Sequence, residues 1–287
     1  MIVFPNAKIN LGLNVIQKRS DAYHDLETIF YPVPLNDVLE VLVTDTDKLK
    51  SDLQKKIITP FGKHIFFSSS GIAVEGVAEN NLCIKACLLY EEKFGLPENI
   101  YIHLHKIIPT GAGLGGGSSD ASFMLTVLNS LCGMKASESE LFSLAVKLGS
   151  DCPFFLYNKP AVGRGRGEDL EPCNISLAGY KLLIIKPNVH VSTQKAFENI
   201  IPEVPEKNII EIVKGSINEW NGILKNDFEK SIFKNYPEIE SIKNKMLESG
   251  AIYASLTGSG SAVYGLFKKD VPGKISFTDS FYFACDL

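Results

Sequence analysis

Alternating apolar and polar positions at the start of the chain predict a β-sheet. Residues 18–21 form a polar break, and around it the alternation indicates strands near residues 2–7, 9–16, 27–33 and 38–43. Residues 44–63 are polar and rich in lysine, which predicts an excursion from the sheet. Residues 64–75 contain one or two further strands. The chain therefore begins with a sheet and not with a leader segment.

The middle of the chain changes between helical and strand periods. Apolar residues recur at helical spacing over 80–94, and they alternate over 100–105, where a strand leads to Pro109. Past a glycine-rich stretch, apolar positions within 121–131 fall on one helix face. A capping box over 137–140 then begins a helix that continues to residue 148. The predicted order is strand, glycine-rich loop, helix.

The last part of the chain has an α+β pattern. Residues 160–180 are rich in glycine and proline and are predicted to form a transition between domains. After it the pattern predicts strands at 181–186, 251–257 and 262–267, with helices near 193–200, 207–214, 217–231 and 237–249.

Composition narrows the class of protein. A length of 287 residues gives, at roughly 150 residues per domain, about two domains. The net charge of -4 leaves no basic excess for a nucleic-acid backbone. Hydrophobic residues at 45% and charged residues at 22% exclude a disordered or membrane-spanning chain. The N-terminus lacks the features of a secretory signal, so the sequence predicts a cytoplasmic protein.

Two pairs of residues have spacings that metal ligands can adopt. Cys83 and Cys87 are spaced for one helix face, but no second pair completes a zinc site, so core packing is favoured. His103 and His105 share one face of a predicted strand without an evident third ligand, and packing is again the favoured interpretation. The six cysteines are expected to be reduced thiols.

The glycine-rich stretch is the feature that departs from an average composition. Five of the 23 glycines lie within residues 111–117, between a strand and a helix start. Bare backbone N–H groups near the positive end of a helix dipole form an anion cradle, which favours phosphate binding over a flexible turn.

Three common phosphate loops do not fit this stretch. A Walker loop needs Lys where Gly117 follows Gly116. A dinucleotide site needs an acidic residue at a strand end about twenty residues later, but 131–140 lies between two predicted helices. Protein-kinase signatures are missing downstream.

Residues 109–119, Pro-Thr-Gly-Ala-Gly-Leu-Gly-Gly-Gly-Ser-Ser, resemble the ATP loop of the GHMP kinase superfamily. Residues 6–11 and 256–262 resemble two further signatures of that superfamily, in the right order. Within it, residues 7–11 followed by 19–24, and then residues 148–155, resemble the 4-diphosphocytidyl-2-C-methyl-D-erythritol kinase family over nearly the whole chain. One departure is Ala22, where the family usually has Gly. If that position needs positive φ, either Ala22 carries strain or the turn shifts, which changes the placement of Tyr23 and His24.

The resemblance implies an α+β fold with the two-domain GHMP kinase architecture. An N-terminal α/β domain, 1–160, carries the glycine-rich phosphate loop, and a ferredoxin-like domain, 161–287, follows, with the active site in the cleft between them. The implied reaction is ATP- and Mg²⁺-dependent phosphorylation of the 2-hydroxyl of 4-diphosphocytidyl-2-C-methyl-D-erythritol, a step in mevalonate-independent isoprenoid synthesis. The partner is thus a small molecule, with no nucleic acid or membrane, and either a monomer or a homodimer fits the sequence.

The resemblance also assigns two catalytic residues. Asp151 follows a helix stop and precedes Pro153, so by itself it reads as an N-cap, whereas the matching family residue accepts the proton of the attacking hydroxyl. Lys8 lies in an apolar strand and therefore needs a carboxylate or phosphate partner, which a structural ion pair also supplies. The resemblance implies that Lys8 faces Asp151, orients it and counters charge on the γ-phosphate.

Further site residues follow from the same resemblance. For Ser118 and Ser119 an N-cap is the alternative, and Ser118 is the candidate Mg²⁺ contact. For Lys106 the alternative to ATP binding is a solvated side chain at the end of a strand. The expected ATP-binding residues are Asn81, Lys106, Pro109, Thr110, Gly111, Ala112, Gly113, Leu114, Gly115, Gly116, Gly117, Ser118 and Ser119.

The acceptor is expected to be held by aromatic and polar side chains. The resemblance implies that Tyr23 and Phe197 sandwich the cytosine while His24 hydrogen-bonds its edge; packing lids are the alternative for the rings. The expected acceptor-binding residues are Asn10, Tyr23, His24, Thr193, Phe197, Gly258, Ser259 and Gly260. Other superfamily kinases, such as homoserine or mevalonate kinase, are the nearest rivals. A non-catalytic nucleotide-binding protein and a dehydrogenase are more distant ones.

Overall fold

The computed structural model describes residues 1–43, 55–74, 76–97, 99–198, 200–269, 271, 275 and 277–287. The chain divides into two compact units. Unit 1 comprises Met1–Ala7, Leu35–Ile108 and Gly115–Asn158. Unit 2 comprises Lys8–Pro34, Pro109–Leu114 and Lys159–Leu287. The glycine-rich loop thus passes along the chain from unit 2 into unit 1. The last passage, from Asn158 to Lys159, falls beside the predicted boundary, while the division into 1–160 and 161–287 stays a prediction.

Unit 1 is built on a five-stranded sheet of order β1-β4-β7-β6-β5. Its strands are β1 (Ile2–Val3), β4 (Val38–Val43), β5 (Lys55–Ile58), β6 (His64–Gly71) and β7 (Asn99–Lys106). β6 and β7 pair in parallel, and the other neighbours pair antiparallel.

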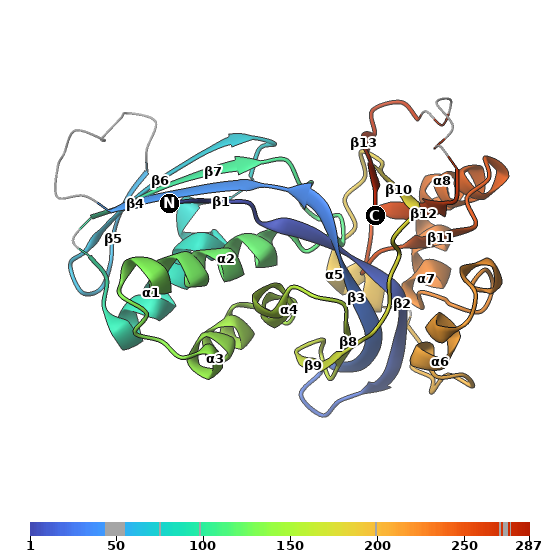
Figure 1. Ribbon diagram of the computed structural model, residues 1–287, viewed down its shortest axis with the longest axis horizontal. Coiled ribbons are helices and arrows are strands. Elements are labelled where there is room, and N and C mark those ends of the chain that lie inside the picture. Colours follow the sequence, from blue (N-terminus) through green and yellow to red (C-terminus); the bar gives the residue numbers. More distant parts are fainter. Residues whose placement is uncertain are drawn as a thin grey trace. The chain divides into compact units, whose positions relative to one another are not determined.

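Helices α1 (Leu82–Phe94) and α2 (Gly116–Leu131) lie along one face of this sheet (Figure 1). A short η2 (Ala78–Asn80) precedes α1, and α3 (Glu138–Leu148) and α4 (Cys152–Tyr157) pack against the other helices. The core between the layers includes Leu39, Ile102, Cys87, Met124 and Leu128. Burial of such side chains, at about 1.5–3 kcal/mol each, holds α2 against the sheet and so fixes the helix that follows the glycine-rich loop.

Unit 2 contains two four-stranded sheets. One, of order β2-β3-β8-β9, is made of β2 (Asn6–Lys18), β3 (His24–Asn36), β8 (Ala161–Arg164) and β9 (Asp169–Pro172). The other, of order β11-β12-β10-β13, is made of β10 (Lys181–Lys186), β11 (Tyr253–Leu256), β12 (Val263–Phe267) and β13 (Phe281–Asp286).

Helices α7 (Phe228–Asn235) and α8 (Pro237–Glu248) supply the core that covers the second sheet, with Ile232, Ile239 and Met246 against Ile185 and Val263. The unit also holds α5 (Thr193–Phe197), α6 (Ile209–Lys214) and the short η3 (Ile217–Glu219). The α+β class expected from the sequence is confirmed. Within the described residues, none of the helices combines the length and the apolar character that a bilayer crossing requires.

Several sequence predictions of elements are corrected by the structure. The predicted helix over 217–231 is wrong, because residues 225–227 bond to β2 instead: Leu13 N–H donates to Lys225 O at 2.8 Å and Asp227 N–H to Leu13 O at 2.9 Å. Residues 160–180 hold the β8–β9 hairpin, and β13 was not predicted. β5 lies within the predicted excursion, whose residues 44–54 are outside the described part of the chain.

Candidate active site

The glycine-rich loop of unit 2 is hydrogen-bonded through its carbonyl groups to distant residues. Gly111 O and Ala112 O accept from Ser261 N and Ala262 N at 3.2 and 3.1 Å, and Leu114 O accepts from Lys8 N at 3.0 Å. Gly113 O accepts from the Thr257 hydroxyl at 3.2 Å. The loop therefore lies directly on the second glycine turn that the sequence singled out, residues 256–262.

Close backbone approach explains two of the glycines in these turns. Gly113 has φ +75°, and a Cβ there would lie 2.0 Å from the Thr257 carbonyl oxygen. Gly258 has φ +54°, and a Cβ there would lie 3.1 Å from the Gly113 carbonyl oxygen. Gly113 thus excludes a side chain by contact as well as by conformation. At Gly258 a Cβ would be a tight contact, and the positive φ makes a side chain strained there.

The backbone N–H groups of the same loop differ from its carbonyl groups in their hydrogen bonding. In the described residues, no acceptor is found for the backbone N–H groups of 111–114, although each of their carbonyls is bonded. A backbone segment with satisfied acceptors and unsatisfied donors is suited to bind an anion, since orphaned donors are otherwise costly.

In unit 1 the loop continues into the N-terminus of α2. Gly115 occupies the N-cap position with φ 73°, and the helix runs for 16 residues from Gly116. Ser118 and Ser119 therefore lie inside the first turn, and the N-cap interpretation of either serine is wrong. Ser119 is fully buried, and its hydroxyl has no partner within the described residues. The N-terminus of a helix carries the positive end of the helix dipole, and here it follows the loop directly in the sequence.

Lys106 belongs to a buried charge cluster with Asp37 and Asp120. Its side chain is 4% exposed, and its ammonium group donates to Asp120 Oδ2 at 2.8 Å and forms an ion pair with Asp37. The solvated strand end considered for Lys106 is therefore wrong. Burial raises the pKa of the Asp120 carboxyl to about 7, against the lowering effect of Lys106. Asp37 Oδ1 also accepts from the N–H groups of Ile107 and Ile108 at 2.6 and 2.8 Å, which fixes the strand end before the loop.

Asn81 and Asp151 both occupy helix N-cap positions in unit 1, with different consequences. The Asn81 side chain accepts from Cys83 N–H at 2.9 Å and so caps α1. Asp151 precedes α4, but its carboxylate accepts no capping hydrogen bond from the described first turn. A capping role accounts for Asn81, whereas it does not account for Asp151.

Lys8, in unit 2, is 3% exposed. Its ammonium donates to Asn10 Oδ1 at 2.7 Å and lies 5.2 Å from the centre of the Phe30 ring. A Cβ on Gly258 would lie 3.5 Å from Lys8 Nζ, so the ammonium sits beside the second glycine turn. Lys8 and Asp151 belong to different units, and their pairing stays a prediction.

Asn10 and Thr257 connect this part of β2 to the second glycine turn. Asn10 N–H donates to Thr257 Oγ1 at 3.1 Å, and that hydroxyl also lies 3.2 Å from Asn10 Oδ1. Thr257 was not among the predicted site residues, although it directly precedes Gly258 in the second glycine turn, residues 256–262. On the same turn, the Ser259 hydroxyl lies 3.3 Å from that of Thr193 at the start of α5.

The predicted acceptor rings contact one another and their neighbours in unit 2. His24 stacks on Phe197 with ring centres 4.7 Å apart and an interplanar angle of 17°. Phe197 also meets the Phe228 ring edge-on at 4.8 Å. Burial, with Lys18 nearby, lowers the pKa of His24, which favours its neutral form. The structure therefore brings together two of the three predicted rings, while Tyr23 stands 55% exposed on the preceding turn.

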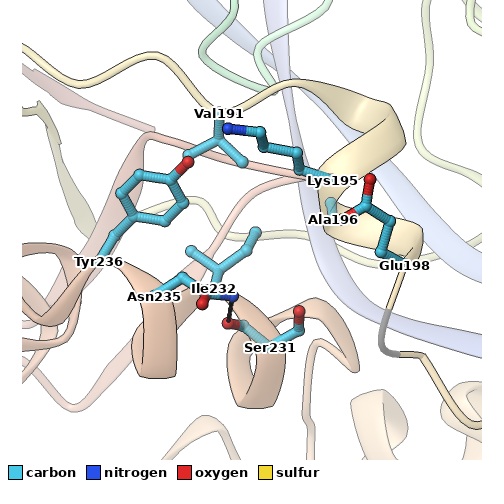
Figure 2. Close-up of a pocket in the computed structure, with 8 residues that line it drawn as sticks. All are labelled: Val191, Lys195, Ala196, Glu198, Ser231, Ile232, Asn235 and Tyr236. Carbon is cyan, nitrogen blue, oxygen red and sulfur yellow. Dashed lines mark hydrogen bonds between the residues drawn. The ribbon is translucent and has the colours of Figure 1, made fainter.

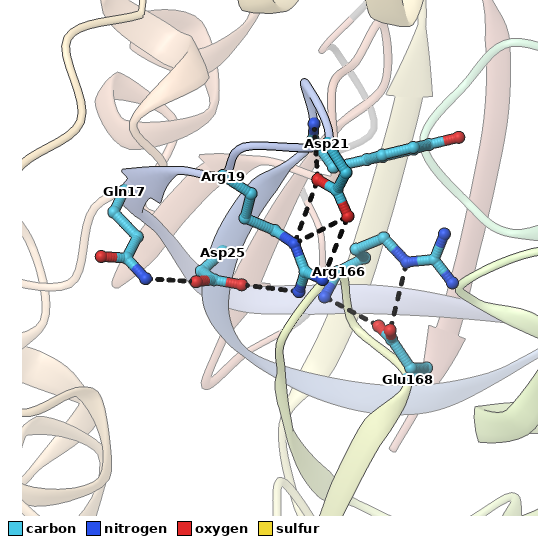
Figure 3. A network of polar contacts seen from close by, with 7 residues as sticks. Gln17, Arg19, Asp21, Asp25, Arg166 and Glu168 are labelled. Carbon is cyan, nitrogen blue, oxygen red and sulfur yellow. Dashed lines mark hydrogen bonds and ion pairs between the residues drawn. The ribbon is translucent and has the colours of Figure 1, made fainter.

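A polar network holds the turn that carries Tyr23 (Figure 3). Arg19 pairs with Asp21 and Asp25, each at 3.1 Å, and Asp21 Oδ1 accepts from Tyr23 N–H at 3.1 Å. Ala22 lies between these residues with φ 68°, the left-handed conformation in which an alanine is strained. The positive φ considered at this departure from the family pattern is confirmed, and the strain stays a prediction.

Ala22→Gly is expected to raise the thermal unfolding midpoint of the full chain by about 2 °C. The change removes a left-handed penalty of about 1–2 kcal/mol, and the larger flexibility of glycine in the unfolded chain offsets about 0.5–1 kcal/mol of it. Ala178→Gly is the control, because Ala178 is exposed and is not among the positive-φ residues of the described chain; it should lower the midpoint. A lower midpoint for Ala22→Gly contradicts the strain argument.

A separate pocket of about 340 Å³ is lined by residues of α5 and α7 and by their neighbours (Figure 2). None of the predicted acceptor residues lines it. Ser231 is 6% exposed, and its hydroxyl has no partner within the described residues. The lining residues are Val191, Lys195, Ala196, Glu198, Ser231, Ile232, Asn235 and Tyr236.

Metal ligands are scarce in the described part of the chain, which contains no group of three or more His, Cys, Asp or Glu side chains able to hold an ion. His103 and His105 share a hydrogen-bond partner, Ser70 Oγ, at 2.9 Å from each ring. Cys83 and Cys87 are fully buried free thiols.

Comparisons with known proteins define the class. The model of the GHMP kinases N terminal domain matches residues 81–159, and the model of the GHMP kinases C terminal domain matches residues 208–276. Together with the phosphate loop and the α+β fold, these matches define a GHMP kinase, a class that uses ATP as phosphate donor.

Individual relatives narrow the family. The chain is 46% identical, over 100% of both chains, to the 4-diphosphocytidyl-2-C-methyl-D-erythritol kinase of Bacteroides fragilis. It is 49% identical to that of Bacteroides thetaiotaomicron, covering 97% of this chain and 96% of the relative. A crystal structure of 4-(cytidine 5'-diphospho)-2C-methyl-D-erythritol kinase matches with a TM-score of 0.71 and 32% identity, over 93% of this chain and 90% of that one. The chain belongs to the 4-diphosphocytidyl-2-C-methyl-D-erythritol kinase family.

Proposed function

We propose that this protein transfers the γ-phosphoryl group of ATP to the 2-hydroxyl of 4-diphosphocytidyl-2-C-methyl-D-erythritol, giving the 2-phosphate and ADP. The observation that carries the phosphate part of the proposal is the loop at 111–114, where every carbonyl is bonded while the described chain offers no acceptor to the N–H groups. The family relationship over the full chain supports the acceptor.

The ATP phosphates are proposed to bind at the glycine-rich loop and the first turn of α2. Its unsatisfied N–H groups and the helix N-terminus meet the phosphate charge without a basic patch, which agrees with a net charge of -4. Residues 109–119 bind the phosphates, and Asn81 and Lys106 lie toward the nucleoside. Lys106 acts there through the strand end that its ion pairs fix.

Mg²⁺ fits these residues in a limited way. The described chain has no carboxylate cage, and an ion that keeps several waters and binds mainly to phosphate oxygens does not need one. Ser118, in the first turn of α2, is the proposed protein contact. When bound, Mg²⁺ neutralises charge on the phosphates.

Asp151 is proposed to accept the proton of the 2-hydroxyl as that oxygen attacks the γ-phosphorus. The position supports this role because the carboxylate does not cap α4 within the described turn. Lys8 is proposed to counter charge on the transferred phosphoryl group, and Asn10 holds its ammonium in place at 2.7 Å. The bond that breaks joins the γ-phosphorus to the bridging oxygen of the leaving ADP.

The acceptor is proposed to bind in unit 2 against Tyr23, His24 and Phe197. Because His24 covers one face of Phe197 at 4.7 Å, a cytosine that stacks on that face takes the place of the imidazole, whose nitrogen is then available for the edge of the base. Asn10, Thr193 and residues 258–260 are proposed to contact the remaining part of the acceptor.

Phe197→Leu is expected to raise the KM for the cytidine acceptor about tenfold and to change the KM for ATP much less. Leucine keeps an apolar side chain but removes the ring face, and stacking of a base is worth about 1–3 kcal/mol. Steady-state kinetics with each substrate varied in turn checks this. Equal rises in both KM values count against stacking on Phe197.

An ADP-release assay with a panel of acceptors tests the proposed function. Turnover is expected with 4-diphosphocytidyl-2-C-methyl-D-erythritol and not with homoserine or mevalonate. Turnover with homoserine alone or mevalonate alone would identify that compound as the acceptor and contradict the proposal. ATP binding without turnover on any acceptor supports a non-catalytic nucleotide-binding protein instead.

A further inference from the structure

Arg166, in unit 2, has a guanidinium group that is oriented by its neighbours, although only some of its N–H donors have a partner within the described residues. It lies in the turn between β8 and β9, and its Cζ is 5.0 Å from the centre of the Tyr23 ring (Figure 3). A guanidinium over an aromatic face is attracted by the ring quadrupole. Arg166 thus places a positive charge next to the Tyr23 ring, which is proposed to bind the cytosine.

Within the described residues, one nitrogen of the guanidinium group, Nε, is anchored by a hydrogen bond. Arg166 Nε donates to Glu168 Oε1 at 3.1 Å, and the backbone N–H of Arg166 donates to Glu168 Oε2 at 2.7 Å. For the donors on Nη1 and Nη2, no partner is found in the described chain. The fork is therefore oriented by Glu168 and Tyr23 while its two terminal nitrogens stay available.

The neighbouring arginines differ in this respect. Arg164, two residues away, pairs with Glu27 at 3.3 Å and with Glu171 at 2.6 Å. Arg19 pairs with both Asp21 and Asp25. Each of these guanidinium groups meets two carboxylates. The hydrogen bond from Arg19 lowers the pKa of Asp21, and the hydrogen bonds from Gln17 and then Arg19 lower the pKa of Asp25. Among these three arginines, Arg166 is the one that meets a single carboxylate within the described residues.

The expected ligand supplies the missing acceptor. A guanidinium fork suits two oxygens of a phosphate group, and charge-assisted bonds of this kind are among the stronger ones. With the base on Tyr23, the diphosphate is the anionic part of the acceptor molecule, and a cation fixed at the ring is suited to meet it. We propose that Arg166 is a substrate-binding residue that donates from Nη1 and Nη2 to the diphosphate of the nucleoside-diphosphate acceptor, an inference that rests on the proposed function.

Three nucleoside probes separate phosphate binding from support of the ring. The dissociation constants of cytidine, CMP and CDP are measured by calorimetry on the full-length protein and on Arg166→Gln. The variant is expected to bind CDP and CMP about tenfold more weakly and cytidine within about twofold of the wild type. Arg166→Lys should restore part of the CDP affinity, since it keeps the charge and loses the fork.

Matched variants control for the turn and for the ring. Arg164→Gln removes a neighbouring arginine that meets two carboxylates and should leave all three dissociation constants unchanged. Tyr23→Leu should weaken cytidine, CMP and CDP alike, because it removes the stacking ring. Thermal unfolding midpoints identify any variant that does not fold, and Arg166→Lys then provides the comparison with the wild type.

Two outcomes overturn the proposal: Arg166→Gln binds CDP like the wild type, or it weakens cytidine as much as CDP. The second outcome means that Arg166 acts only through Tyr23. These results are distinct from failure of the proposed function, which appears as a wild-type protein that releases no ADP when the cytidine acceptor is present.

Discussion

Asp151→Asn lowers kcat by more than about a hundredfold and leaves the thermal midpoint and both KM values close to those of the wild type. Asparagine has almost the same shape as aspartate, but its amide cannot accept the proton of the attacking hydroxyl. Because the carboxylate makes no capping bond to the described turn of α4, the substitution removes no capping interaction.

Steady-state and single-turnover kinetics check this expectation. Asp169→Asn is the matched control, since Asp169 is exposed on β9 and is not among the proposed site residues; it should have wild-type kinetics. A folded Asp151→Asn variant with near-normal kcat removes Asp151 from the proposed mechanism. A loss of folding in that variant assigns Asp151 a structural role instead.

Gly113→Ala lowers kcat/KM for ATP by about a hundredfold or more. A Cβ at this position would lie 2.0 Å from the Thr257 carbonyl, so the loop has to move off the second glycine turn. The bond from the Thr257 hydroxyl to Gly113 O is then strained or lost. Displacement of a binding group by about 1 Å can by itself cost a hundredfold.

A second glycine separates the clash from backbone strain. Gly179 also has positive φ, +85°, but a Cβ there would meet nothing within 4 Å. Gly179→Ala should therefore carry the conformational cost with unchanged ATP kinetics. Wild-type ATP kinetics in Gly113→Ala would show that close approach of the two turns is not required for phosphate binding.

Local signals predicted the elements around the phosphate loop well. The helix over 82–94, β7 and the helix from 138 depend on periodicity and on caps that lie within a few residues, and the capping box at Ser137 and Glu140 is present. The predicted helix over 217–231 failed because its centre pairs with Leu13, more than two hundred residues earlier. Periodicity contains no information about such a partner.

For the site residues too, local features were predictable from the sequence and distant contacts were not. The resemblance identified the loop, but no local pattern could show that Lys106 is buried, because this depends on Asp37, which lies 69 residues earlier. The first turn of α2 was misassigned because Gly115 adopts a left-handed N-cap, so the helix starts before the serines. No sequence pattern pointed to Arg166. Its proposed role depends on Glu168, two residues away, and on Tyr23, which is far away in the sequence.

The bonds from residues 111–114 to Lys8, Thr257, Ser261 and Ala262 have a consequence for biosynthesis of the protein. A ribosome that has released only the first two hundred residues has made all the loop glycines but not the turn against which they lie. The nascent chain then lacks three of these four anchors, because loop closure across about 150 residues awaits the end of translation. Nucleotide binding on the ribosome is expected to begin only after the stretch that contains β11 and β12 has emerged.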